Sequence, residues 1–167
     1  MKKILLFIIL CSLKVQSQNM LLDILPLKGQ KVVYTKVHEV IDASKLQLSD
    51  KAQEWFQEHQ MPVLSNLAID ERHHLVSGKM YFKELWGPND FPELYKTIYC
   101  NIGLTLINER YQYEISHFVV KEPQSEIQLE IYKMDQKKLQ KYNPDFYKRI
   151  DSKIKTMITS LENKMME

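Results

Sequence analysis

The sequence predicts an α+β domain in which two helices cover one face of a curved antiparallel sheet, in the order β-α-β-β-β-β-α. Two observations carry this prediction. Polar and apolar residues alternate over most of the middle of the chain, as they do in half-buried strands. Two other segments carry an apolar residue every three or four positions, the spacing of an amphipathic helix. One such layer pair is the economical architecture for these elements.

The first strand and the first helix are predicted by adjacent segments. Lys31 to Ile41 alternates and is rich in β-branched residues, which favours a strand. The helix that follows has Ser44 as its expected N-cap, and Pro62 closes the helical segment. Trp55 and Phe56 lie on its apolar side and are expected in the core.

Four further strands are predicted after this helix. Short polar breaks separate most of them, which is typical of antiparallel hairpins. The predicted strands span residues 64–70, 73–85, 94–108 and 111–121. A longer loop is expected at 86–93, with the sequence WGPNDFPE.

The C-terminal part predicts a long closing helix laid across the sheet. The segment EIQLEIYKM, residues 126–134, is ambiguous between an edge strand and the start of a helix. Asn143 is the expected cap and Pro144 the first helical residue of the closing helix. Its apolar stripe consists of Phe146, Ile150, Ile154, Met157, Ile158, Leu161 and Met165.

The N-terminus predicts export. Lys2 and Lys3 precede an apolar run from Ile4 to Leu13, which is typical of a signal peptide cleaved between Ser17 and Gln18. The run is too short to favour a retained anchor, and Leu10 before Cys11 disfavours a lipoprotein. The expected location is periplasmic, outer-membrane-associated or secreted, with no transmembrane span after cleavage. The expected organisation is signal peptide 1–17, lead 18–29, α+β domain 30–121 and helical extension 122–167.

Charge and cysteine usage narrow the function classes. Removing residues 1–17 takes three of the 23 basic residues and none of the 21 acids, so the net charge moves from +2 to −1. A near-neutral chain lacks the positive surface that phosphate binding needs, so nucleic acid is not an expected partner. Cys100 is then the only remaining cysteine, which excludes an intramolecular disulfide, and it is expected to be buried.

Several segments together resemble a known family. They are LPLKGQKVVYTKVHEV, KAQEWFQEH, the Ser77-Gly78-Lys79 step and GLTLINERYQYEISHFVV. In order and spacing they are similar to the exported proteins of Bacteroides-type bacteria called domain of unknown function 4468, over about residues 25 to 121. The resemblance implies a TATA-binding-protein-like (TBP-like) fold and export. It implies no catalytic residues, and the name of the fold does not transfer DNA binding.

Alternation sorts the strand residues onto two faces. The predicted helix-covered face contains Val33, Val37, Val76, Met80, Phe82, Ile98, Cys100, Ile102, Leu104, Leu106, Tyr113 and Ile115. The predicted open face contains Tyr34, Lys36, His38, Lys79, Tyr81, Lys83, Tyr95, Thr97, Tyr99, Asn101, Gln112, Glu114, Ser116 and Phe118. The open face is either a solvated surface stabilised by cross-strand pairs or a binding platform for a peptide, a glycan or another envelope protein. The expected binding residues are Lys79, Tyr81, Tyr95, Tyr99 and Phe118.

No catalytic, metal or cofactor site is predicted. His73 and His74 are neighbours on a strand or in its turn, so they are expected to point apart, and Ser116 and His117 likewise. Alternation puts His117 under the helices. Gly78 is expected at a bend or bulge.

The predicted function is therefore a non-catalytic binding or assembly module of the cell envelope. One alternative is a small-molecule-binding protein or hydrolase with a site near the 86–93 loop, joining Trp86 or Asp90 to His73 or His74. Another is a structural domain whose C-terminal helix pairs with a second chain. The sequence leaves the oligomeric state open.

Overall fold

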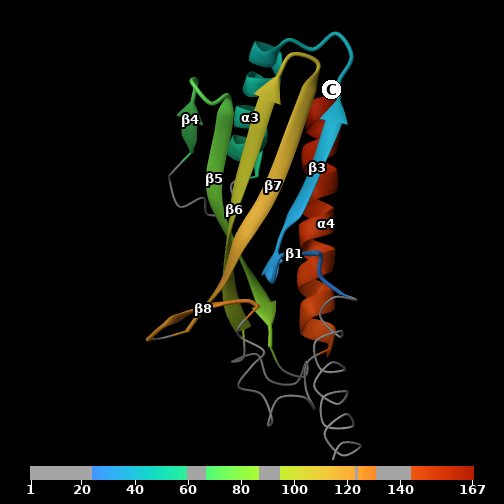
Figure 1. Ribbon diagram of the computed structural model, residues 1–167. Helices are drawn as coiled ribbons and strands as arrows, with labels where there is room; N and C mark the ends of the chain where they lie inside the picture. Colours follow the sequence, from blue (N-terminus) through green and yellow to red (C-terminus); the bar gives the residue numbers. More distant parts are fainter. Residues whose placement is uncertain (1–23, 60–66, 87–94, 123, 131–143) are drawn as a thin grey trace, which may run out of the picture.

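The computed structural model describes residues 24–59, 67–86, 95–122, 124–130 and 144–167. Within them, two helices, α3 (Lys45–Glu58) and α4 (Pro144–Met166), lie on the same side of a six-stranded sheet (Figure 1). The strands of this sheet are β3 (Tyr34–Glu39), β4 (Ala68–Asp70), β5 (Leu75–Leu85), β6 (Tyr95–Ile107), β7 (Arg110–Lys121) and β8 (Glu126–Gln128). A short hairpin, β1 (Leu27–Lys28) and β2 (Lys31–Val32), precedes them. The α+β class with an antiparallel sheet is confirmed.

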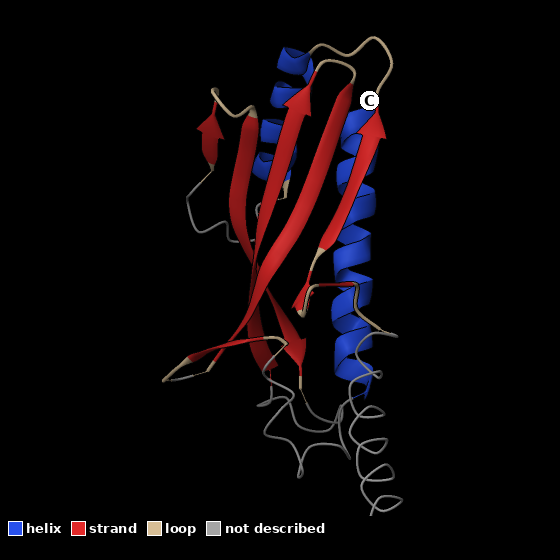
Figure 2. Cartoon of the chain, in the orientation of Figure 1, coloured by secondary structure: helices blue, strands red, loops and turns tan. Residues whose placement is uncertain are grey.

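The sheet has the strand order β3-β7-β6-β5-β4, and every neighbouring pair is antiparallel. The three long central strands, β5, β6 and β7, form two hairpins in succession (Figure 2). Strand β3 pairs with the first half of β7, and β8 pairs with the last three residues of β7. The ambiguous segment is thus a strand over residues 126–128. Residues 64–66 of the predicted second strand and the 87–93 part of the predicted loop lie outside the described residues.

Helix α3 begins where the sequence predicts. Ser44 accepts a hydrogen bond from the backbone N–H of Gln47, and the Gln47 side chain accepts one from the backbone N–H of Ser44, which forms a capping box. Trp55 and Phe56 are both buried, as predicted, and Trp55 is fully enclosed. Pro62, the expected end of the segment, lies outside the described residues.

Helix α4 buries its apolar stripe in the same core as the sheet and α3. Six of the seven predicted stripe residues are buried, and Met157 packs partly against the same core. At its N-terminal end, Arg149 donates to the buried carboxylate of Glu84 at 2.7 Å, and Lys153 pairs with the same carboxylate at 3.0 Å. These contacts fix α4 to β5. Asn143 lies outside the described residues, and neither described helix has the length and apolarity to cross a membrane.

The face assignment is confirmed over β5, β6 and the first half of β7. All ten helix-side residues predicted there are buried, which are Val76, Met80, Phe82, Ile98, Cys100, Ile102, Leu104, Leu106, Tyr113 and Ile115. The assignment is wrong for β3. Tyr34 is only 6% exposed, whereas Val37 is 51% exposed and Ile41 lies in the solvent-exposed turn beyond the strand.

Helix α4 explains the reversal on β3. The Tyr34 hydroxyl donates to Asp151 Oδ1 at 2.9 Å, and His38 Nε2 lies 2.8 Å from Glu162 Oε1. Lys36 reaches the same Glu162 carboxylate at 3.4 Å. Because α4 supplies carboxylates to their polar tips, Tyr34 and His38 can turn their apolar parts toward the core, while Lys36 stays exposed.

A β-bulge in β7 reverses a second prediction. Tyr99 pairs with Val119 and Asn101 with Ser116, so His117 and Phe118 together oppose the single residue Cys100. His117 has a φ of 56°, a left-handed conformation for which histidine is one of the more tolerant side chains. The extra residue shifts the alternation, so Phe118 is fully buried and His117 is exposed. Both had been predicted on the opposite faces.

Gly78 is not the bend that the sequence predicts. The register between β5 and β6 is unbroken from Leu75 to Leu85. The glycine instead allows a close approach of α3, because a Cβ at this position would lie 2.8 Å from Cε1 of Phe56. Ordinary carbon–carbon contacts are about 3.5–4.0 Å, so Gly78 makes room for the ring.

Candidate functional site on the open sheet face

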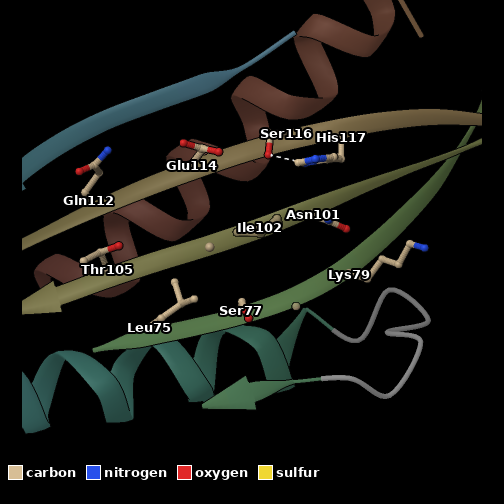
Figure 3. Close-up of a pocket in the computed structure, with 12 residues that line it drawn as sticks. Leu75, Ser77, Lys79, Asn101, Ile102, Thr105, Gln112, Glu114, Ser116 and His117 are labelled. Atoms are coloured by element: carbon tan, nitrogen blue, oxygen red, sulfur yellow. Dashed lines mark hydrogen bonds between the residues drawn. The ribbon is translucent and has the colours of Figure 1, made fainter. Parts of the chain in front are cut away.

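The uncovered face of the central strands is hollowed. The hollow has a volume of about 490 Å³ and is open to solvent on one side (Figure 3). Its lining, called the open-face hollow below, comes from β5, β6 and β7 and consists of Leu75, Ser77, Gly78, Lys79, Asn101, Ile102, Gly103, Thr105, Gln112, Glu114, Ser116 and His117. The volume falls within the range of small-ligand sites, and most of the side chains are polar.

Small side chains form the floor of the hollow. Ser77 on β5, Gly103 on β6 and Glu114 on β7 are cross-strand neighbours in one row. Ser77 has a small side chain and Gly103 has none, so little side-chain volume lies beside the Glu114 carboxylate. A Cβ at Gly103 would meet only Leu75, at an ordinary 3.5 Å. On the β3 side, Gln112 Nε2 donates to the Thr35 hydroxyl at 3.2 Å. The hollow therefore exists because Ser77 and Gly103 are small, and not because the sheet is poorly packed.

The bulge places Ser116 and His117 together at one end of the hollow. Ser116 Oγ lies 3.0 Å from His117 Nδ1, and Figure 3 shows this contact beside Glu114. The prediction that neighbouring Ser116 and His117 face apart is therefore wrong, because the left-handed residue interrupts the alternation. Bulges commonly re-aim side chains toward functional surfaces. Glu114, Ser116 and His117 give this end of the hollow hydrogen-bonding groups of three chemical types.

Beyond the hollow, the same face carries a lysine–tyrosine cluster formed by Lys79, Tyr81, Lys83, Tyr99 and Lys121. The Tyr81 and Tyr99 rings are a direct cross-strand pair with centroids 5.6 Å apart. Lys79 Nζ and Lys121 Nζ lie 5.6 and 5.7 Å from the centroid of the Tyr99 ring. Two ammonium groups therefore converge on one aromatic ring.

The predicted binding residues fall into two groups. Lys79, Tyr81 and Tyr99 lie together in the cluster, and Tyr95 is exposed on the same face at the start of β6. Phe118 does not belong to the site, since the bulge turns it into the core against Tyr34. The ligand-binding role of the other four stays a prediction.

Sequence reasoning missed Lys121 and His117 as members of the open face. The alternation of β7 contained evidence that both residues belong to the open face. Without an inserted residue, Lys121 would fall on the helix-covered side, where an unpaired ammonium group is costly. That conflict could have indicated a shift of phase between Ser116 and Lys121.

The two adjacent histidines belong to the turn before β5, so the strand begins at Leu75 and not at His73 as predicted. Asp70 Oδ1 accepts from the backbone N–H groups of Arg72 and His73, and its Oδ2 lies 2.7 Å from His73 Nδ1. The contact with His73 lowers the pKa of Asp70, and the Asp70 carboxylate raises the pKa of His73. His74 contacts Lys45 instead. The described residues contain no cluster of three or more His, Cys, Asp or Glu that could hold a metal ion.

A serine–histidine contact also joins the two helices. Ser160 Oγ lies 2.6 Å from His59 Nε2, and His59 Nδ1 lies 3.0 Å from the carbonyl oxygen of Trp55. The Trp55 indole N–H donates to the same Ser160 oxygen at 3.3 Å. A nucleophile needs donors placed for an oxyanion and room for a substrate. Here the serine oxygen is occupied by helix-to-helix contacts, so its role is to connect α3 and α4.

The alternative site near the 86–93 loop is not assembled by the described residues. Trp86 is buried with its ring against Phe146, at a centroid distance of 4.7 Å. His73 lies beyond the other end of β5, so the strand separates the two side chains. Asp90 lies outside the described residues.

A second hollow, of about 420 Å³, lies between the N-terminal segment, β3 and α4. Its polar groups are already engaged with one another. The Tyr34 hydroxyl donates to Asp151 Oδ1, and Lys155 Nζ lies 2.7 Å from Asp151 Oδ2. This hollow is a less favourable ligand site than the open-face hollow.

Comparison with solved structures identifies the fold. The chain superposes on a DUF4468 family protein from Bacteroides ovatus with a TM-score of 0.67 and 14% identity, over 89% of this chain and 94% of that one. It superposes on a TBP-like protein from Parabacteroides distasonis with a TM-score of 0.62 and 17% identity, over 84% and 96% respectively. No protein-family model and no curated protein matches the sequence. The chain thus has the TBP-like α+β fold, and its resemblance to domain of unknown function 4468 is confirmed in the fold.

Proposed function

We propose that the protein is an exported, non-catalytic binding module of the bacterial cell envelope and that it engages its partner through the uncovered sheet face. The observation that carries the proposal is the open-face hollow of about 490 Å³ together with the adjoining lysine–tyrosine cluster. The basic and apolar N-terminal segment supports export, because it has the form of a signal peptide.

Several features favour binding over catalysis. In the open-face hollow, Ser116 contacts His117, and the adjoining groups are the side chains of Asn101 and Glu114 on separate strands. The described residues that line the hollow include no helix N-terminus to bind an oxyanion. The thiol of Cys100 is buried on the other face, and burial raises its pKa to about 12, so it is not a nucleophile at neutral pH.

The surface of the C-terminal helix favours this proposal over a pairing role of that helix. The apolar stripe of α4 is already covered by the sheet and α3. Apart from Met166 at its last position, what remains exposed on α4 is mainly polar, including Ser152, Lys155, Thr156 and Thr159. A surface of this composition is a poor docking site for a second chain.

The proposal is tested by co-sedimentation of the exported chain with envelope fractions of the host bacterium. Gly103→Leu fills the floor of the hollow with a side chain, and the open space above Gly103 accommodates it. Thr156→Leu places the same side chain on the exposed surface of α4 and is the matched control. We expect the parent chain and Thr156→Leu to co-sediment and Gly103→Leu to remain in the supernatant. Equal binding by the Gly103→Leu variant, or no binding by the parent chain, would count against the proposal.

A further inference from the structure

We infer that the ligand of the open face is an acidic carbohydrate, whose carboxylate groups are bound by the lysine–tyrosine cluster and whose hydroxyl groups are bound in the open-face hollow. The inference rests on the proposed function, since it names the ligand class of the same surface. It starts from the distribution of paired and unpaired lysines.

Several lysines elsewhere in the described part of the chain have acidic partners. Lys96 pairs with Glu122, and on α4 Lys153, Lys155 and Lys164 each contact at least one carboxylate within 3.2 Å. In contrast, the three lysines of the cluster, Lys79, Lys83 and Lys121, form no ion pair with any described residue. Three lysines without an acidic partner therefore lie together on the face that the helices leave uncovered.

This arrangement is unfavourable in the free protein and favourable with an anion bound. Lys83 and Lys121 lie in the same cross-strand row with one strand between them, and Lys79 shares the Tyr99 ring with Lys121. Like charges gathered on one part of a surface repel one another. A ligand carboxylate placed over Tyr99 would contact ammonium groups on both sides and convert the repulsion into attraction.

The hollow beside the cluster supplies groups that suit hydroxyls. Asn101, Gln112 and Glu114 are exposed on its walls, and amide and carboxylate groups can donate to or accept from a hydroxyl. The Tyr81 and Tyr99 rings offer flat apolar faces at one end. Lys79 lines the hollow and also belongs to the cluster, so the two parts are continuous.

The same residues argue against a protein partner. Interfaces between proteins are depleted in lysine and glutamate and enriched in aromatic residues, arginine and methionine at their centres. The open-face hollow and its cluster contain three lysines and a glutamate, and of the enriched types only the two tyrosines. A hydroxyl-rich anionic ligand matches this composition better than a peptide does.

The test is calorimetric titration of the full exported chain with three probes of the same length. They are an octamer of galacturonic acid, a neutral galactose octamer and an octaglutamate peptide. We expect the acidic sugar to bind and to bind more weakly as salt is raised, because its contacts are charged and exposed. The neutral sugar and the peptide are expected to bind at least tenfold more weakly.

Three variants test the residues. Lys79→Met and Lys121→Met are each expected to weaken binding of the acidic octamer about five- to tenfold, as loss of one exposed charge-assisted contact does. Lys148→Met, on the exposed surface of α4, is the control and is expected to leave the affinity unchanged.

The outcomes separate the inference from the proposed function. Tighter binding of octaglutamate or of the neutral octamer, no binding of the acidic octamer, or equal affinities in Lys79→Met and the parent chain would overturn the acidic-carbohydrate inference. If the envelope co-sedimentation is still abolished by Gly103→Leu in that case, the open face remains the binding surface and only the ligand class is wrong. If the co-sedimentation is unaffected by Gly103→Leu, both fail.

Discussion

Substituting Gly78 with alanine perturbs a close contact between α3 and the backbone of the sheet. The new Cβ would lie 2.8 Å from Cε1 and 3.3 Å from Cδ1 of the Phe56 ring. Relief needs the ring to move by roughly 0.7–1 Å, to ordinary contact distance. The ring cannot move freely, because Phe56 is 3% exposed and packs edge-on against the fully buried Trp55.

The expected loss of stability follows from two opposing contributions. An extra methyl group in a packed core costs about 1–3 kcal/mol, and replacing a strand glycine by alanine recovers about 0.5–1 kcal/mol. The middle of each range gives a net loss in the free energy of unfolding of about 1 kcal/mol for Gly78→Ala. With a urea m-value of about 2 kcal/mol/M, the midpoint falls by roughly 0.5 M.

Urea denaturation followed by circular dichroism measures this change, and Gly103→Ala is the matched control. Gly103 lies on the neighbouring strand but faces the open side, where a Cβ meets only an ordinary contact. We expect Gly103→Ala to be neutral or slightly stabilising. In a double-mutant cycle, Phe56→Leu should cost less in the Gly78→Ala background than in the parent chain, because the smaller side chain removes the clash. Equal midpoints for the two alanine variants, together with additivity in the cycle, would refute the reasoning.

Three further predictions concern the rest of the chain. Arg149→Met is expected to lower the free energy of unfolding by about 1–2 kcal/mol, because it leaves the buried carboxylate of Glu84 on β5 with one partner fewer. The control Lys148→Met should change the free energy of unfolding by less than about 0.5 kcal/mol, so similar urea midpoints for the two variants would contradict this prediction. Cys100 should react with a thiol reagent at pH 8 only as the chain unfolds in urea, since burial raises the thiol pKa to about 12 and keeps it protonated; rapid labelling of the folded chain would contradict its burial. The pKa of His73, measured by NMR, should lie above its ordinary value and should fall in Asp70→Asn. The contact between His73 and Asp70 therefore stabilises the fold below the ordinary histidine pKa, and this stabilisation is lost as the pH rises through the raised pKa. An unchanged His73 pKa in the variant would show that the turn contact does not form in solution.

Much of the fold could be predicted from residue patterns, because each pattern depends on local chemistry. The capping box at Ser44 and the apolar spacing of α4 are properties of short segments, and both elements begin or lie where these patterns indicate. The long strands β5 and β6 were assigned correctly because they alternate without interruption against an unbroken register.

The errors arise where a strand depends on a partner far away in the sequence. Tyr34 could be placed on the covered face only with the knowledge that Asp151, 117 positions later, accepts its hydroxyl hydrogen bond. Phe118 was misplaced because alternation carries no information on an inserted residue, and the bulge at His117 shifts every later side chain of β7.

The candidate site was predicted only in part for the same reason. Lys79, Tyr81 and Tyr99 were identified because they stand on regular strands. The hollow beside them depends on small residues meeting across three strands, Ser77 beside Gly103 and Gly103 beside Glu114. Such a row follows from the register, which the sequence alone does not define.

The most direct test of the central claim, that the uncovered sheet face is the binding surface, is NMR mapping of backbone amides during titration with the galacturonic acid octamer. The account predicts that the shifted amides lie in three ranges, residues 77–83 of β5, 97–103 of β6 and 114–121 of β7, while those of α4 stay in place. Shifts confined to α4 or to the outer edge of β3 would contradict it, whereas no shift at any amide would contradict only the acidic-carbohydrate inference.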